Sequence, residues 1–257
     1  EVEAAGVWML AGVIARAERV LVHSRYGAEV VRLEAEGSGL TADVAVVPFA
    51  APPSPDRAAE RGRSRPPATP LVASFGLVDP VKRPHLLVEA LPALRERHPG
   101  LRLALVGPVE RGERSSLLRR ARALGVGAAL IITGAVDQEH YRRWIELADV
   151  AVQLRAFSQG EASLAVAETL AAGLPTVVTR VGWLAEMPGE AVSGVGLDPR
   201  PEELVEAIGR LLSDDDAWTA HRDAGLRWAR RHRVERVAEA LLAELVPGWR
   251  DATAAAR

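Results

Sequence analysis

Lys82 is the single lysine among the 32 lysine and arginine residues of this chain. It lies in Phe75-Gly-Leu-Val-Asp-Pro-Val-Lys-Arg-Pro84, where an apolar run ends at Gly76 and a helical pattern begins. An ammonium is a compact charge on a flexible stem and can reach a phosphate, whereas a guanidinium is a planar fork. Chance within an arginine-rich composition explains Lys82 equally well, so its role depends on the residues around it.

A second feature of this kind is the loop Gln159-Gly-Glu-Ala-Ser163, which precedes an apolar helical pattern. We expect a helix over Leu164–Ala172, with Ser163 as its N-cap and Gly173 as its C-cap. The N–H groups and partial positive charge at a helix N-terminus favour a diphosphate. Lys82 reaches the same point if the strand before it is a neighbour of the strand before this loop.

Two carboxylates accompany this loop. Glu168 lies about one and a half turns into the expected helix, on an otherwise apolar segment. It either faces solvent or accepts hydrogen bonds from ribose hydroxyls, and the sequence gives both alternatives equal weight. Glu161 would be repelled by phosphates unless it faces sugar hydroxyls. Arg155 and His85, each near an expected strand or helix end, are weaker candidates for ligand contact.

From Leu71 onward, apolar β-prone runs alternate with helical patterns. Strands are expected at Leu71–Phe75, Leu101–Val106, Ala129–Thr133, Val150–Leu154, Thr176–Thr179 and Ala191–Val195. Helices are expected at Pro84–Arg97, Glu113–Leu124, Gln138–Leu147 and Leu164–Ala172. Continuous apolar strands are typical of a parallel sheet covered on both faces. The alternation therefore predicts a doubly wound α/β fold, in which ligands bind beyond the carboxyl ends of the strands.

Three further helical patterns follow without intervening strands, at Pro201–Ser213, Ala217–Arg231 and Val234–Leu245. We expect them to pack on one side of the domain as a helical tail. The run Asp214-Asp-Asp216 is interpreted as a helix break and N-cap, not as a metal site.

The first fifty residues form a smaller pattern. A strand at Val20–Ser24, a helix at Arg25–Ala35 and a strand at Val44–Pro48 make one βαβ-like unit, too small to stand alone. The segment 51–70 is rich in proline, arginine and alanine and is interpreted as a linker. The predicted organisation is thus an N-terminal remnant (1–50), a linker (51–70) and a complete domain (71–257). Because the chain begins at Glu1 without a methionine, we expect it to be part of a longer protein.

The composition limits the classes of function and partner. A net charge of -2 and a pI near 6.4 give no reason to expect nucleic acid as a partner. The chain has no cysteine, which excludes disulfides and thiolate metal sites and fits a reducing, cytoplasmic location. Its six histidines show no metal-ligand spacing, so we expect no metal site and no cofactor.

The run Gly160-Glu-Ala-Ser-Leu-Ala-Val-Ala-Glu-Thr-Leu-Ala-Ala-Gly-Leu-Pro-Thr-Val-Val-Thr-Arg-Val-Gly182 resembles the donor-binding signature of glycosyltransferase family 4. These are retaining enzymes of the GT-B architecture. The spacing Gly76…Lys82 is similar to the diphosphate-contacting loop of that family. Other landmarks match in the same order, namely Ser24, Val44–Pro48, Leu105–Gly107 and Thr133-Gly134. The resemblance covers about residues 20 to 212.

The resemblance implies a two-domain GT-B enzyme whose Rossmann-like C-terminal domain binds a nucleotide-diphospho-sugar. By position, Lys82 would contact the diphosphate, and the backbone of Glu161-Ala162-Ser163-Leu164 would surround the phosphates and the donor sugar. Glu168 would hold the ribose, and Gly134-Ala135-Val136 would lie beside the base. Such enzymes usually need no metal, because the lysine and the helix N-terminus neutralise the leaving diphosphate.

The chain departs from the family pattern at three points. Leu77 stands where the family has an arginine, and Arg83 is the nearest candidate to replace it. The first of two paired glutamates is replaced by Gly160, so Glu161, one residue later, is the possible catalytic carboxylate. Nearly all of the N-terminal domain is absent. We therefore expect the acceptor, a sugar, a lipid or another small molecule, to need that domain or a partner chain.

Two alternatives remain open from the sequence. A GT-B relative that epimerises a sugar nucleotide would have a similar diphosphate site, although no added acid-base histidines are evident. A non-catalytic sugar-nucleotide-binding module acting with a partner chain would fit the missing N-terminal half.

Overall fold

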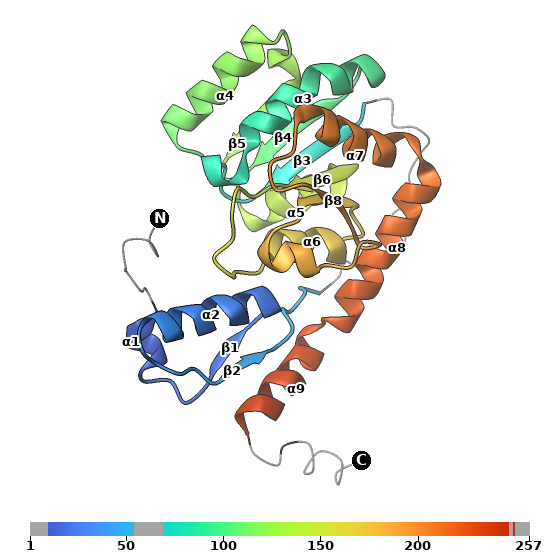
Figure 1. Cartoon of the computed structure of the whole chain (residues 1–257). Helices are drawn as coiled ribbons and strands as arrows, with labels where there is room; N and C mark the ends of the chain where they lie inside the picture. Colours follow the sequence, from blue (N-terminus) through green and yellow to red (C-terminus); the bar gives the residue numbers. More distant parts are fainter. Residues whose placement is uncertain (1–9, 54–68, 247–248, 250–257) are drawn as a thin grey trace.

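The structure is a computed structural model that describes residues 10–53, 69–246 and Trp249. It contains a small two-stranded sheet and a six-stranded sheet (Figure 1). The two-stranded sheet pairs β1 (Val20–Val22) with β2 (Val44–Val46) in parallel. The predicted division into remnant, linker and complete domain stays a prediction, because residues 54–68 lie outside the described part.

The six-stranded sheet is parallel throughout and has the order β5-β4-β3-β6-β7-β8. Its strands are β3 (Leu71–Phe75), β4 (Arg102–Val106), β5 (Leu130–Gly134), β6 (Val150–Gln153), β7 (Thr176–Thr179) and β8 (Val192–Val195). The chain builds outward from β3 in one direction and from β6 in the other. The prediction of a doubly wound parallel sheet is therefore confirmed, with the reversal between β3 and β6.

Helices cover both faces of this sheet. One face carries α3 (Pro84–Arg97), α4 (Arg111–Ala123) and α7 (Pro201–Ser213), and the other carries α5 (Gln138–Leu147) and α6 (Leu164–Ala171). Consecutive strand residues point to opposite faces: Val72 packs with the first group of helices and Ala73 with the second. Both faces are buried, which explains why these strands are continuously apolar.

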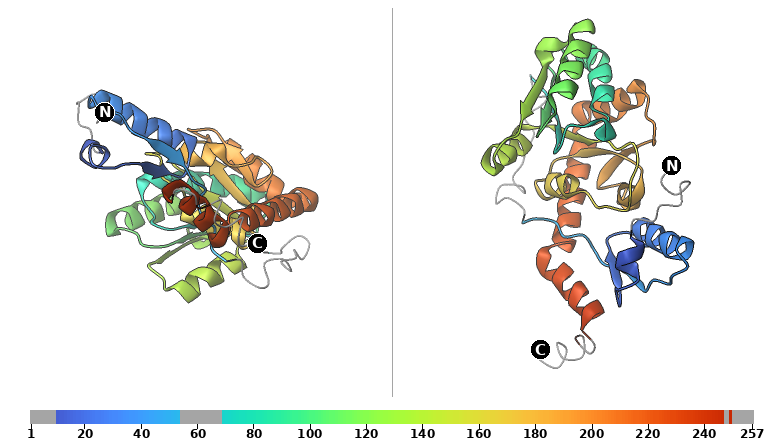
Figure 2. Two further views of the ribbon diagram at one scale, coloured as in Figure 1. Left: turned by 90° about the horizontal axis from the view of Figure 1, so that it is seen from below. Right: turned by 90° about the vertical axis from the view of Figure 1, so that its left-hand side faces the viewer.

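The C-terminal helices differ in part from the expected tail. Helix α7 packs against α3 within the domain, and α8 (Asp215–Arg231) packs against α6. Asp214 caps α8, accepting a hydrogen bond from the backbone N–H of Ala217 at 2.9 Å, which confirms the predicted N-cap. Helix α9 (Val234–Leu245) leaves the domain and reaches the N-terminal unit, where Arg19 pairs with Glu244 at 3.0 Å (Figure 2).

The N-terminal unit consists of α1 (Ala11–Ile14), β1, α2 (Arg25–Gly37) and β2. Its hydrophobic core is small and is formed by a cluster that contains the buried residues Ile14, Val31 and Ala35. The segment after β2 contacts the larger domain: Phe49 packs edge-on against Trp183, with the ring centroids 5.7 Å apart. No helix in the described part of the chain is long and apolar enough to cross a membrane.

Candidate functional site

The candidate site lies where the sheet reverses its winding direction. Strands β3 and β6 are parallel neighbours, so the loops that follow them leave the sheet side by side. A hydrogen bond of 2.8 Å from the backbone N–H of Ala156 to the carbonyl oxygen of Val81 joins these loops. The crevice at such a topological switch point is where ligands bind in open α/β sheets.

Lys82 lies on the β3 side of this switch point. It ends a short 3-10 helix (Pro80–Lys82) that Asp79 caps by accepting a hydrogen bond from the backbone N–H of Lys82 at 3.0 Å. The ammonium turns back over the strand and donates to the carbonyl oxygen of Phe75 at 3.2 Å. Gly76 has φ +94°, and a Cβ there would lie 2.6 Å from Nζ of Lys82. Glycine at this position therefore leaves room for the ammonium above the strand end.

The surroundings of Lys82 lower its pKa overall. Burial lowers the pKa of Lys82, the nearby charge of Arg155 lowers this pKa further, and Asp79 opposes both effects. Among the described residues, no carboxylate lies within ion-pair distance of Nζ of Lys82. A half-buried cation that lacks a counter-ion favours the binding of an anion.

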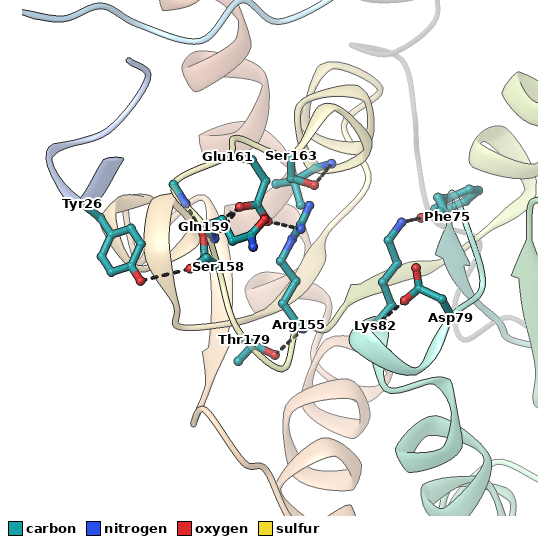
Figure 3. Close-up of polar contacts among 12 residues, drawn as sticks. Tyr26, Phe75, Asp79, Lys82, Arg155, Ser158, Gln159, Glu161, Ser163 and Thr179 are labelled. Atoms are coloured by element: carbon teal, nitrogen blue, oxygen red, sulfur yellow. Dashed lines mark hydrogen bonds and ion pairs between the residues drawn. The ribbon is translucent and has the colours of Figure 1, made fainter. Parts of the chain in front are cut away.

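The β6 side of the crevice carries the loop that precedes α6. Ser163 is buried and caps α6, accepting a hydrogen bond from the backbone N–H of Val166 at 3.5 Å. Gly160 has φ +100° and packs against Gly27 of the N-terminal unit, where an added Cβ would lie 3.0 Å from Cα of Gly27. Leu164 is exposed, and Ala162 is half-buried. Figure 3 shows this loop beside Lys82 on neighbouring strand ends.

The carboxylate of Glu161 is hydrogen-bonded within its own loop. It accepts hydrogen bonds from the hydroxyl of Ser158 at 3.1 Å and from the backbone N–H of Gln159 at 2.7 Å. Arg155 forms an ion pair with the other carboxylate oxygen (Figure 3). A catalytic role for Glu161 stays a prediction, and it would require this ion pair to open.

Glu168 is half-buried on α6 and faces α5. The hydroxyl of Tyr141 donates a hydrogen bond of 2.9 Å to Oε2 of Glu168. Burial raises the pKa of Glu168, and the hydrogen bond from Tyr141 partly offsets this rise. A cavity of about 270 Å³ between α5 and α6 is lined by residues that include Tyr141, Glu168, Pro52 and Pro53. Tyr141 was not predicted as a site residue, because no local pattern distinguishes it from other residues of α5.

Of the residues expected beside the base, Val136 shares an apolar cluster with Tyr141. Gly134 ends β5 with φ +74°, and Val136 is half-buried in the same apolar cluster as Phe75 and Tyr141. Tyr141 and Val136 thus lie in one apolar cluster with Phe75, whose carbonyl oxygen accepts the hydrogen bond from Lys82. Whether a nucleotide uses these positions stays a prediction.

Arg83 does not turn toward Lys82. It has φ +49° and forms an ion pair with Asp198, in the segment between β8 and α7. Its guanidinium is therefore engaged elsewhere, and Leu77 is half exposed at the position where the family has an arginine. In the part of the chain that the structure describes, no group of three or more histidine, aspartate or glutamate side chains could hold a metal ion.

Sequence comparison connects this geometry with known proteins. The profile described as "Glycosyl transferases group 1" matches residues 56–228. The chain is 30% identical over 199 residues to the D-inositol 3-phosphate glycosyltransferase of Corynebacterium urealyticum, covering 74% of this chain and 46% of that protein. It is 32% identical over 207 residues to the GDP-mannose-dependent alpha-(1-6)-phosphatidylinositol monomannoside mannosyltransferase of Mycolicibacterium smegmatis, covering 78% and 54%.

Solved structures share the fold at lower identity. The sucrose-phosphate synthase of Thermosynechococcus elongatus superposes with a TM-score of 0.74 at 21% identity, covering 95% of this chain and 60% of that chain. Anabaena HepE, solved with UDP and glucose, gives a TM-score of 0.70 at 19% identity, covering 95% and 66%.

The chain thus spans about half the length of the curated relatives that it matches, mainly their C-terminal half. The matched profile covers more than half of this chain, and the doubly wound sheet is the one that the GT-B superpositions share. The chain therefore belongs to the group 1 glycosyl transferases, which are the retaining GT-B enzymes of glycosyltransferase family 4.

Proposed function

We propose that this chain is the donor-binding part of a retaining glycosyltransferase that takes a sugar from a nucleotide-diphospho-sugar. One observation carries the proposal above all. The ammonium of Lys82 forms no ion pair with a carboxylate among the described residues, and it lies at the switch point beside the loop that begins α6. A cation and a helix N-terminus that flank one crevice are suited to a leaving diphosphate, whose negative charge grows as the sugar departs.

The remaining site residues follow from this placement. Gly76 gives the ammonium its position, and the backbone of residues 160–164 surrounds the phosphates and the donor sugar. Glu168, oriented by Tyr141, accepts hydrogen bonds from the ribose hydroxyls. The segment 134–136 lies beside the base. Neither a metal nor a cofactor is part of the proposal, because Lys82 and the α6 terminus supply the positive charge.

Relatives indicate which donors to examine first. One matched protein is named as GDP-mannose-dependent, and a structural neighbour was solved with UDP. We therefore choose GDP-mannose and UDP-glucose, with an ADP-sugar as the third base. The acceptor, a sugar, lipid or other small molecule, and the catalytic side chains on its side belong to the part of the relatives that this chain does not span. A cytoplasmic location stays a prediction from the composition.

Isothermal titration calorimetry of the chain with GDP-mannose, UDP-glucose and an ADP-sugar tests the proposal. At least one donor should bind, and Lys82→Ala should weaken that donor strongly. The control is Arg19→Gln, which removes the ion pairs of Arg19 with Asp43 and Glu244, both away from the switch point. Absence of binding by all three donors, or equal effects of the two variants, would overturn the proposal.

The alternative of a non-catalytic sugar-nucleotide-binding module has one observation in its favour. Glu161, the possible catalytic carboxylate, is held by Arg155, Ser158 and Gln159. Donor turnover by a longer protein that includes the N-terminal domain distinguishes the two functions. Binding without any turnover in that protein favours the module.

A further inference from the structure

Arg155 is the second cation of the crevice, and the proposed function assigns it no role. It lies two residues after the end of β6, the strand that neighbours β3. Its backbone N–H donates a hydrogen bond of 3.2 Å to the hydroxyl of Thr179. Its side chain is 19% exposed and extends between Lys82 and the loop that begins α6 (Figure 3). The backbone hydrogen bond from Ala156 to Val81 holds Arg155 and Lys82 on adjacent segments.

Two positive charges therefore lie on adjacent segments at the switch point, and Glu161 forms its ion pair with Arg155 and not with Lys82. Arg155 is paired with Glu161, whereas Lys82 has only the carbonyl oxygen of Phe75 as its side-chain partner in the described residues. The charge of Arg155 contributes to the lowered pKa of Lys82, which means that the two cations are close enough to repel each other. An anion with two adjacent negative groups would relieve this repulsion better than one carboxylate.

The carboxylate of Glu161 stays hydrogen-bonded when its ion pair with Arg155 is broken. Glu161 keeps the hydroxyl of Ser158 and the backbone N–H of Gln159 as donors, and its side chain is 43% exposed to water. An ion pair that has solvent access on one side contributes little to stability. Exchanging Glu161 for another anion at Arg155 therefore leaves no buried polar group unsatisfied.

We propose that Arg155 is an exchangeable diphosphate ligand. Without a donor, Arg155 is paired with Glu161. When a donor binds, its diphosphate displaces this carboxylate and binds Arg155 beside Lys82. The inference rests on the proposed function and adds a residue to its site. A planar guanidinium can bind two phosphate oxygens at once, which complements the point charge of Lys82. The alternative is that Arg155 only braces the loop 158–161.

Three variants separate exchange from bracing: Arg155→Gln, Glu161→Gln and the double variant. Calorimetry of the full chain with UDP and UMP, GDP and GMP, and ADP and AMP selects the tightest pair. Arg155→Gln should weaken the diphosphate about 10- to 100-fold, the range for a hydrogen bond to a charged group, and the monophosphate much less. Glu161→Gln should tighten the diphosphate about three-fold or more, because it removes a competing carboxylate.

The double variant tests whether both effects pass through one contact. Once Arg155 is glutamine, replacing Glu161 should no longer change diphosphate affinity, so the two effects should not add. Arg19→Gln serves as the control, because it removes the arginine–carboxylate pairs with Asp43 and Glu244, both away from the switch point. Thermal unfolding of each variant checks that it is folded.

The outcomes are distinguishable. Diphosphate binding by the wild type that Arg155→Gln leaves unchanged overturns this inference alone, whereas a wild type that binds no diphosphate also removes the proposed function. Unchanged or weaker diphosphate binding by Glu161→Gln assigns Arg155 to bracing. This second criterion holds even if Arg155→Gln fails to fold, because Glu161 is exposed at the loop surface.

Discussion

Glu186 accepts a hydrogen bond of 2.8 Å from the backbone N–H of Tyr26, although Tyr26 lies in α2 of the N-terminal unit and Glu186 ends a 3-10 helix (Gly182–Glu186) of the larger domain. The same carboxylate accepts a second one from the N–H of Arg25 at 3.1 Å. Glu186 thus satisfies two of the free N–H groups at the start of α2. The hydroxyl of Tyr26 donates to the carbonyl oxygen of Ser158 at 3.0 Å, so the same helix start also contacts the loop before α6.

Replacing Glu186 with alanine should loosen the N-terminal unit from the six-stranded domain. The two N–H groups lose their acceptor, and we expect the free energy of unfolding to fall by about 1 kcal/mol, as for other lost helix caps. Urea unfolding monitored by tryptophan fluorescence measures the change. Ser24→Ala is the matched control, because Ser24 caps the same helix from within the unit, accepting from Gly27 at 2.8 Å. Only Glu186→Ala should split the transition into two, and a single unshifted transition would contradict the prediction.

Gly107 should tolerate alanine poorly. It has φ +145°, and an added Cβ would lie 2.1 Å from the carbonyl oxygen of Gly76, so the substitution must push apart the ends of β3 and β4. We expect Gly107→Ala to lower the free energy of unfolding by about 2–3 kcal/mol, the range for an overpacked site. Gly134→Ala is the control: Gly134 has φ +74° but nothing within 4 Å of an added Cβ, so the loss should be about 1 kcal/mol of backbone strain. Equal urea midpoints for the two variants would refute the steric explanation.

Local pattern was sufficient to predict most of the fold. The strand and helix bounds agree with the structure to within two residues, because each continuous apolar run is buried on both faces, as Val72 and Ala73 illustrate. The adjacency of β3 and β6, on which the convergence of Lys82 with α6 depended, is confirmed.

Contacts between distant segments were not predictable in the same way. Tyr141 with Glu168, Arg83 with Asp198 and Tyr26 with Ser158 each join residues whose own neighbourhoods give no sign of the partner. Likewise α9 has an ordinary amphipathic pattern, which does not reveal that it leaves the domain for the N-terminal unit. Periodicity reports which face of an element is buried, but it does not report what that face meets.

Glu168 should matter more for the nucleoside than for the diphosphate. Glu168→Gln removes a charged acceptor, and we expect about a ten-fold or larger loss of nucleoside diphosphate affinity, with little change for pyrophosphate. Because burial raises the pKa of Glu168 above 4.5, its ionised form is lost on acidification earlier than that of an ordinary glutamate. Nucleoside diphosphate affinity should therefore decline as the pH falls through this raised pKa.

Tyr141→Phe tests the cause of that decline. The hydroxyl of Tyr141 stabilises the ionised form of Glu168, so its removal should move the decline in affinity to a still higher pH. Calorimetry across the acidic range measures the shift, with pyrophosphate as the ligand that should not respond. Equal losses for nucleoside diphosphate and pyrophosphate would contradict a ribose contact.

Lys82 should give diphosphate affinity a dependence on alkaline pH. Lys82→Ala should weaken a diphosphate by about 1.5–3 kcal/mol, as for the loss of a charged hydrogen-bond partner. Burial and Arg155 hold the pKa of Lys82 below 10.5, so wild-type affinity should fall as the pH rises through this lowered value, where the ammonium loses its proton. Calorimetry with the tightest nucleoside diphosphate over an alkaline series measures this.

Protein stability should respond to the same titration with the opposite sign. Between the lowered pKa and 10.5, the unfolded chain binds the Lys82 proton more readily than the folded chain does, so the contribution of this residue to stability rises with pH. Lys82→Arg is the matched variant, because a guanidinium stays protonated in this range, and it should remove both dependences. Diphosphate affinity that falls equally with pH in the wild type and in Lys82→Arg would place the titrating group elsewhere and separate Lys82 from the anion.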